Sequence, residues 1–256
     1  MGDYSFVSLA AVKAMLGDAQ TTNDAILRRA LEVAAVAAEQ VAHQRFQPHL
    51  AVRYFTPHDI DELRLYPGLV SITTLKADMD GDQIWETTWA TTDYNLKPYN
   101  VAADLKPYLS FCRSVNGSKY LPTGMPRGIE VTGKWGYQEN LLTLASILTS
   151  AVNASITTIS VTTGTDFEAL QTIVIDSEQL YITSISSNNL TVIRGTNGTT
   201  AASHLISAAI TLHRYPADLV EAISIQAERF FRRKDTPLGV GGGSDLAMPR
   251  GIPTLD

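Results

Sequence analysis

The sequence predicts an α+β fold class: a mainly helical core with a small antiparallel sheet, plus an inserted all-β module that forms a small barrel or sandwich. Three patterns support this expectation. Apolar residues recur at helical spacing near both ends of the chain, alternate with polar residues over much of 50–137, and give way over 141–213 to short runs rich in Ser, Thr, Ile and Asn. The 256 residues, 45% of them hydrophobic, suffice for one large domain or two small ones.

Three segments have the pattern of amphipathic helices. Ser8 is expected to cap a short helix that ends at Gly17. A longer helix is expected over 21–46, where apolar residues, mostly alanine, cover so much of the circumference that neighbours must cover it on more than one side. A third helix is expected over 216–233, with Pro216 in its first turn, acids near its start and a basic cluster at its end, as the helix dipole favours.

Alternation of apolar and polar residues predicts a small antiparallel sheet with one wet face, made of strands at 50–55, 70–78, 84–89 and 128–137. After Tyr137 the composition changes, and the helical pattern resumes only at Pro216. We therefore expect a β module inserted at an exposed loop of another domain. The predicted domains are a core of 1–138 and 215–235, a β module of 141–213, and an extended C-terminal arm of 236–256.

The sequence contains no motif that indicates enzymatic or metal chemistry. The glycines of "RRKDTPLGVGGGSD" (232–245) follow a helix instead of preceding one, which argues against a phosphate-binding loop. The acidic run "DMDGDQIWE" (78–86) resembles a calcium loop weakly, because Gly81 stands fourth and the flanks read as strands, so a hairpin turn centred on Asp80 and Gly81 is expected. Cys112 is expected to be a small buried hydrophobe. We expect no catalytic residue, no cofactor and no metal, and a protein that is not an enzyme.

Charge and hydropathy narrow the possible partners. The formal net charge of −6 gives no global basic field for binding nucleic acid, and neither an export signal nor a membrane span is predicted. One local cluster stands out, because Arg229, Arg232, Arg233 and Lys234 exceed what the helix dipole requires. This cluster suggests docking onto an acidic partner surface.

Three segments, in this order, resemble the head-tail connector (adaptor) proteins of tailed bacteriophages, the group with HK97-type and SPP1-type members. They are the pair of N-terminal helices ("LAAVKAMLG" and "TTNDAILRRALEVAAVAAEQVAHQRF"), the strand "IEVTGKWGY", and the last helix with its exit, "PADLVEAISIQAERFFRRKDTPLGVGGG". Together they cover about 1–138 and 215–245. The β module departs from shorter family members, in which that strand leads almost directly into the last helix.

The resemblance implies a structural virion protein that forms a ring, usually of twelve subunits, under the portal of the DNA-filled head. The implied partners are further copies of the chain, the portal protein and a downstream head-completion or tail-completion protein, while genomic DNA passes through the lumen without sequence recognition. It also implies a location in the head-tail neck of the virion, assembly in the bacterial host cytoplasm, and no membrane contact.

The same resemblance implies two groups of interaction residues. Portal docking is expected at the end of the last helix and along the arm, at Arg232, Arg233, Lys234, Pro237, Leu238, Gly239, Gly241 and Leu246. Packing between or within subunits is expected for Leu27, Leu31, Ala34 and Ala38. The glycines would let the arm leave the subunit as an extended segment that becomes ordered on its partner.

Two other functions stay open. The first alternative is a surface-binding or carbohydrate-binding protein based on the β module, although the three tryptophans lie outside it and Phe167 and Tyr181 are its main aromatic residues. The second is an enzyme whose site carries no recognisable motif.

Overall fold

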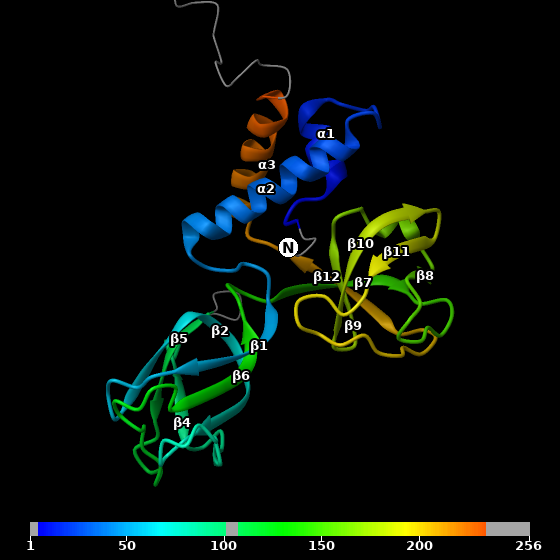
Figure 1. The fold of residues 1–256 in the computed structure, drawn as a ribbon. Coiled ribbons are helices and arrows are strands. Elements are labelled where there is room, and N and C mark those ends of the chain that lie inside the picture. The colour runs from blue at the N-terminus through cyan, green and yellow to red at the C-terminus, as the bar shows by residue number, and fades with distance from the viewer. Residues whose placement is uncertain (1–4, 101–106, 234–256) are drawn as a thin grey trace, which may run out of the picture.

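The computed structural model describes residues 5–100 and 107–233, in which three helices pack on one of two antiparallel sheets (Figure 1). The helices are α1 (Leu9–Leu16), α2 (Asp24–Ala42) and α3 (Ala217–Arg232). The side chain of Ser8 accepts a hydrogen bond from the Ala11 N–H, and Gly17 ends α1 in the left-handed conformation, with φ of 65°. Both ends of α1 are therefore confirmed as the sequence predicts.

The alanine-rich helix is shorter than the expected segment 21–46. It ends where His43 adopts a left-handed conformation with φ of 50°. The Phe46 N–H then donates to Glu39 Oε1 at 2.9 Å, which ties the exit of the helix back onto its last turn. The third helix is confirmed, with Pro216 at its N-cap.

The first sheet contains β1 (His49–Phe55), β2 (Glu62–Ala77), β3 (Thr87–Trp89), β4 (Tyr94–Lys97), β5 (Tyr108–Arg113) and β6 (Ile129–Trp135). Its order is β1-β6-β2-β5-β4, with β3 paired to β2. The sheet has a hydrophobic core of its own around Trp135, Phe111 and Leu75, all of them fully buried. It is therefore an independent layer of the molecule rather than a small appendage to helices.

The expectation of a mainly helical core is wrong, because the described residues are mostly β and only 21% helical. The error comes from the segment between β1 and β6. Strand β2 continues through Pro67 and Gly68, which read in the sequence as a break. Its pairing with β5 shifts register between Arg64 and Leu69, the kind of irregularity at which a strand tolerates proline.

The second sheet lies within the segment expected to form the β module. Its strands are β7 (Asn140–Ile147), β8 (Thr158–Ser160), β9 (Thr172–Ile175), β10 (Glu178–Ser186), β11 (Asn189–Ile193) and β12 (Ala209–Arg214), in the order β7-β12-β9-β10-β11-β8. A bridge between Leu148 and Val161 joins the ends of the two outer strands, so the sheet closes into a small barrel. A short 3-10 helix (Gly164–Asp166) follows β8. The division into independently folding domains stays a prediction.

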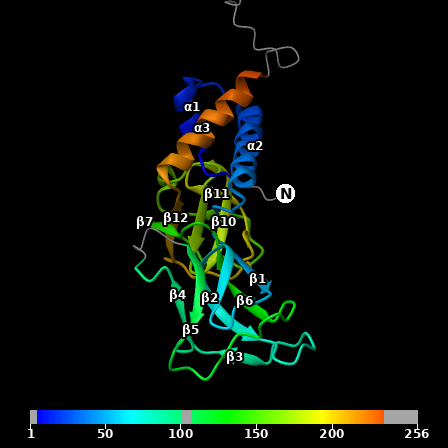
Figure 2. The same ribbon diagram turned by 90° about the vertical axis from the view of Figure 1, so that its left-hand side faces the viewer.

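The helical layer, the barrel and the first sheet meet at a buried polar junction. Gln179 Nε2 donates to the Pro48 carbonyl at 2.9 Å, and Gln47 Nε2 donates to Gln179 Oε1 at 3.1 Å. Asn197 Nδ2 donates to the same Gln179 oxygen at 2.8 Å, while the Tyr215 hydroxyl donates to Gln47 Oε1. The result is an elongated molecule with the helices at one end and the first sheet at the other (Figure 2).

Candidate interaction surfaces

Most of the residues expected to pack between or within subunits are buried in the core of the single subunit. Leu27, Leu31 and Ala34 of α2 are buried in a cluster that includes Ile223 of α3 and Tyr181 of the barrel, and Ala38 is partly buried against it. In this structure the four side chains hold the helical layer together and fix it to the barrel.

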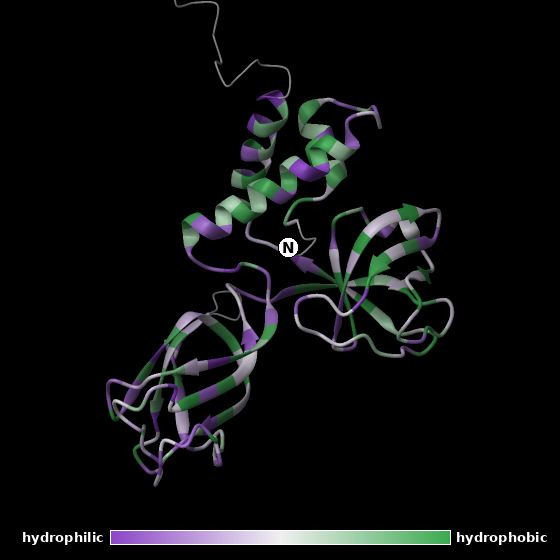
Figure 3. Ribbon diagram, in the orientation of Figure 1, coloured by the Kyte–Doolittle hydropathy of each residue, from purple (hydrophilic) through white to green (hydrophobic). Residues whose placement is uncertain are grey.

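Helix α2 also exposes apolar side chains beside its buried face. Ile26 and Val33 lie on one stripe along the flank of the helix and are 43% and 45% exposed, and Val41 in the last turn is 84% exposed. Hydrophobic residues therefore occupy much of the circumference of α2, as the colours in Figure 3 show. The sequence carries both stripes of the helix, but only the structure shows which one faces water.

The basic end of α3 lies at the far end of the helical layer from the first sheet (Figure 1). Arg232 is exposed and pairs with Glu228 one turn earlier, at 2.7 Å between Nη2 and Oε1. Arg233 is exposed and caps the helix through its backbone N–H. The remaining residues expected to dock on the portal lie outside the described residues: Lys234, Pro237, Leu238, Gly239, Gly241 and Leu246.

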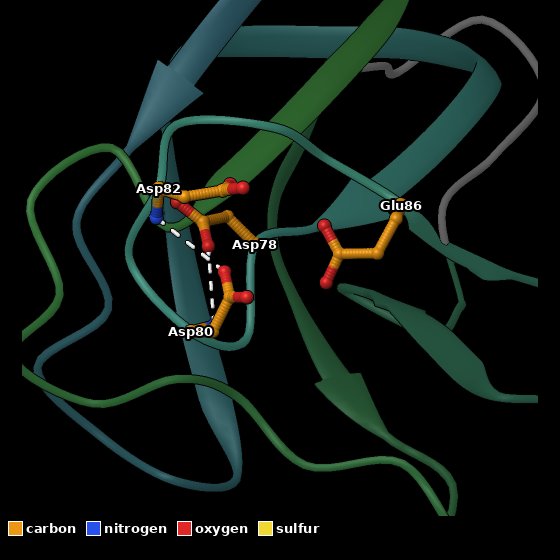
Figure 4. Close-up of side chains that lie close together, drawn as sticks. All are labelled: Asp78, Asp80, Asp82 and Glu86. Atoms are coloured by element: carbon orange, nitrogen blue, oxygen red, sulfur yellow. Dashed lines mark hydrogen bonds between the residues drawn. The ribbon is translucent and has the colours of Figure 1, made fainter.

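The acidic run at 78–86 forms the connection of the β2–β3 hairpin. The expected hairpin is confirmed, but the expected turn centred on Asp80 and Gly81 is wrong, because the whole segment from Asp78 to Glu86 joins the two strands. One oxygen from each of Asp78, Asp80, Asp82 and Glu86 lies within 4.8 Å of the others (Figure 4). The buried Asp78 carboxylate accepts hydrogen bonds from the N–H groups of Asp80, Gly81 and Gln83. These bonds outweigh the effect of burial and lower the pKa of Asp78. They explain the burial of Asp78, because its carboxylate holds the backbone of the loop. We assign no metal to the cluster.

Cys112 departs from the expectation of a buried hydrophobe, because its side chain is only half-buried. Its Sγ lies 3.3 Å from the Tyr99 hydroxyl and 3.7 Å from the Asn95 carbonyl oxygen. Its thiol therefore has polar neighbours rather than an apolar cage.

A buried ionic network occupies the end of the barrel away from the helices. Glu178 receives two hydrogen bonds from Arg194, one from His204 Nε2 at 2.9 Å, and one each from the N–H groups of Gly195 and Ala202. Burial alone would raise the pKa of Glu178, but these donors outweigh it and hold the pKa at about 2. His204 Nδ1 lies 2.7 Å from Asp176 Oδ2. One carboxylate thus fixes both ends of the loop 194–204.

An open groove of about 860 Å³ lies between α1 and the other end of the barrel. Its walls are mainly apolar and include Leu9 and Ala14 from the helix and Phe167, Ala169 and Ile185 from the barrel. Periodicity in the sequence could not reveal this groove, because its two walls are more than a hundred residues apart in the chain.

No protein-family model, no curated protein and no solved structure matches this chain. In the part of the chain that the structure describes, no helix is long and apolar enough to span a membrane. The resemblance to phage connectors rests on the sequence segments alone.

Proposed function

We propose that this chain is a structural adaptor subunit of a phage neck. Copies of it assemble into a ring that joins the portal to the next head-completion or tail-completion protein and lets the genome pass through. The observation that carries the proposal is the exposed apolar stripe of α2.

The α2 stripe needs a partner that the single chain does not supply. The helix already buries Leu27 and Leu31 in its own core, and a surface helix of a monomer normally presents polar residues on the opposite face. Here Ile26 and Val33 are exposed on the flank between those two faces. Exposed apolar patches mark interaction sites, and a heterologous contact repeated in every copy closes into a ring when the rotation permits.

The arrangement of the layers supports a role between two partners. Helix α3 ends in Arg232 and Arg233 at one end of the elongated molecule, and the first sheet forms the opposite end (Figure 2). The basic helix end suits an acidic partner surface. The C-terminal arm follows this helix end in the sequence. The first sheet would then face the second partner.

Nothing in the barrel favours the alternative of a carbohydrate-binding module. The described barrel residues 140–214 contain two aromatic side chains, Phe167 and Tyr181, and both are buried. Sugar platforms use exposed aromatic rings, which this part of the chain does not offer.

A charge placed on the stripe tests the proposal. Val33→Asp should abolish ring assembly on the cognate portal, because an unpaired carboxylate would be buried in the interface. Val115→Asp is the matched control, because Val115 is 91% exposed in a loop after β5 and outside the stripe. Native mass spectrometry measures the rings, and circular dichroism checks the fold. Normal ring assembly by the Val33→Asp variant would contradict the proposal.

A further inference from the structure

Two apolar surfaces lie at opposite ends of the barrel, and we propose that they bind each other between neighbouring copies of the chain. The first is a knob formed by Ile156, Leu205 and Ile206. The second is the groove between α1 and the barrel. This inference rests on the proposed function and names a specific contact within the ring.

The knob exposes aliphatic side chains on a backbone that is firmly held. Leu205 and Ile206 are 79% and 61% exposed, and Ile156 beside them is 36% exposed. The N–H groups of His204 and Val152 donate to each other's carbonyl oxygens at 2.9 and 3.0 Å. This bridge holds the two loops of the knob side by side.

The buried ionic network fixes the same two loops from within. Arg194 Nη1 donates to the carbonyl oxygens of Asn153 and Ile156 at 2.9 and 2.8 Å, and Nη2 donates to that of Ala202 at 2.6 Å. The same guanidinium is paired with buried Glu178. Because the knob is already ordered in the free chain, its binding would not have to overcome the cost of ordering a loop.

The groove offers a matching receptor. Its volume of about 860 Å³ lies within the range of pockets that enclose whole ligands, so it has room for several aliphatic side chains. Its walls include Leu9, Phe167 and Ile185. The knob segment 201–208 contains no Lys, Arg, Asp or Glu, so its entry brings no charge against these walls.

The knob of one copy cannot reach its own groove. Strand β10 begins at Glu178, beside the knob, and reaches Ile185, at the groove, seven residues later. That separation corresponds to roughly 23 Å at about 3.3 Å per residue. In the proposed contact the groove therefore receives the knob of a second copy. Such a contact joins two different surfaces, and this is the type of contact that builds rings.

Disulfide trapping between copies tests the contact. In a Cys112→Ser background, chains carrying Leu205→Cys are mixed with chains carrying Ala14→Cys, assembled on the cognate portal, and oxidised. Ala14 is an exposed residue of α1 that lines the groove. We expect disulfide-linked heterodimers, identified by a mass tag on one partner. Val115→Cys mixed with Ala14→Cys should give none.

Several outcomes would overturn the inference. One is an assembled ring without Leu205 to Ala14 heterodimers, and another is an equal yield with the Val115→Cys control. A third is a disulfide between Ala14→Cys and Leu246→Cys in place of Leu205→Cys, which would assign the groove to the C-terminal arm.

Two further variants approach the contact from each side. Leu205→Asp places a charge on the knob, and Ala14→Trp fills the groove from an exposed helix position. Each should weaken association between copies at least tenfold in sedimentation experiments, and unchanged association in both would refute the contact. Rings that form without the crosslink would contradict the contact but not the proposed function. Crosslinked copies that do not bind the portal would support the contact and contradict the proposed function.

Discussion

Glu178 and Arg194 form a bidentate ion pair inside the barrel, with Arg194 Nε 2.7 Å from Oε1 and Nη2 2.8 Å from Oε2. Both side chains are buried, and the same guanidinium holds three carbonyl oxygens of the surrounding loops. A buried ion pair is weak evidence for stability, because the cost of removing two charges from water offsets their attraction. Its clearest consequence here is the fixed shape of the barrel end that carries Leu205 and Ile206.

Removing one partner of this pair should be costly. Arg194→Met leaves the Glu178 carboxylate buried without its cation, which should lower the free energy of unfolding by about 3–5 kcal/mol. Arg232→Met is the matched control, because the pair of Arg232 and Glu228 is exposed and should contribute less than about 1 kcal/mol. Urea unfolding followed by circular dichroism measures both variants. Similar losses in the two would show that the buried pair has no special role.

Acid should destabilise the fold through two buried histidines. Burial lowers the pKa of His213 from its ordinary 6.5 to about 4, and burial together with Arg45 and Arg53 lowers that of His49 equally far. Between these two pH values the unfolded chain takes up protons that the folded chain does not. Stability is therefore full above about pH 6.5 and falls as the pH drops toward 4, by up to roughly 3 kcal/mol per histidine.

His213→Gln isolates one of these two contributions. Urea unfolding at pH 7 and pH 4.5 should show a smaller loss of stability in this variant than in the unmodified chain. An identical pH dependence in both would mean that His213 does not titrate as its burial requires.

Two glycines with the same backbone φ allow the cost of a steric contact to be separated from the cost of backbone strain. Gly198 and Gly124 both have φ of 78°, but a Cβ on Gly198 would lie 2.2 Å from the Leu50 carbonyl oxygen, while one on Gly124 would meet nothing within 4 Å. Gly124→Ala should cost about 1 kcal/mol of backbone strain. Gly198→Ala should cost clearly more, because it also pushes the barrel loop away from β1. Thermal unfolding compares the two variants, and equal losses would argue against a tight junction at Leu50.

The two faces of α2 should respond differently to substitution. Leu31→Ala creates a cavity in the core and should lower the free energy of unfolding by about 2–5 kcal/mol without affecting the exposed stripe. Val33→Asp, on the exposed stripe, should change stability little. Chemical denaturation of the isolated chain measures both, and a large loss in Val33→Asp would place that side chain in the core.

The helices could be predicted from the sequence because their signals are local. Ser8 and Gly17 mark the ends of α1 within a single short segment. Four strands of the first sheet could be predicted for the same reason, near 50–55, 70–78, 84–89 and 128–137. Its full extent could not, because β2 begins at Glu62 and passes through Pro67, and its pairing with β5 joins segments distant in the chain. The choice between the two apolar stripes of α2 depends on tertiary contacts, which periodicity does not reveal. The knob and the groove are built from loops and helix faces that no single-segment pattern connects.

The most direct test of the adaptor account is co-assembly with the cognate portal. Native mass spectrometry of the mixture should show a ring-sized complex with the full chain. A variant truncated after Asp235 should lose that complex, since the arm expected to dock would be missing. A full chain that ignores the portal across a range of salt concentrations would contradict the account.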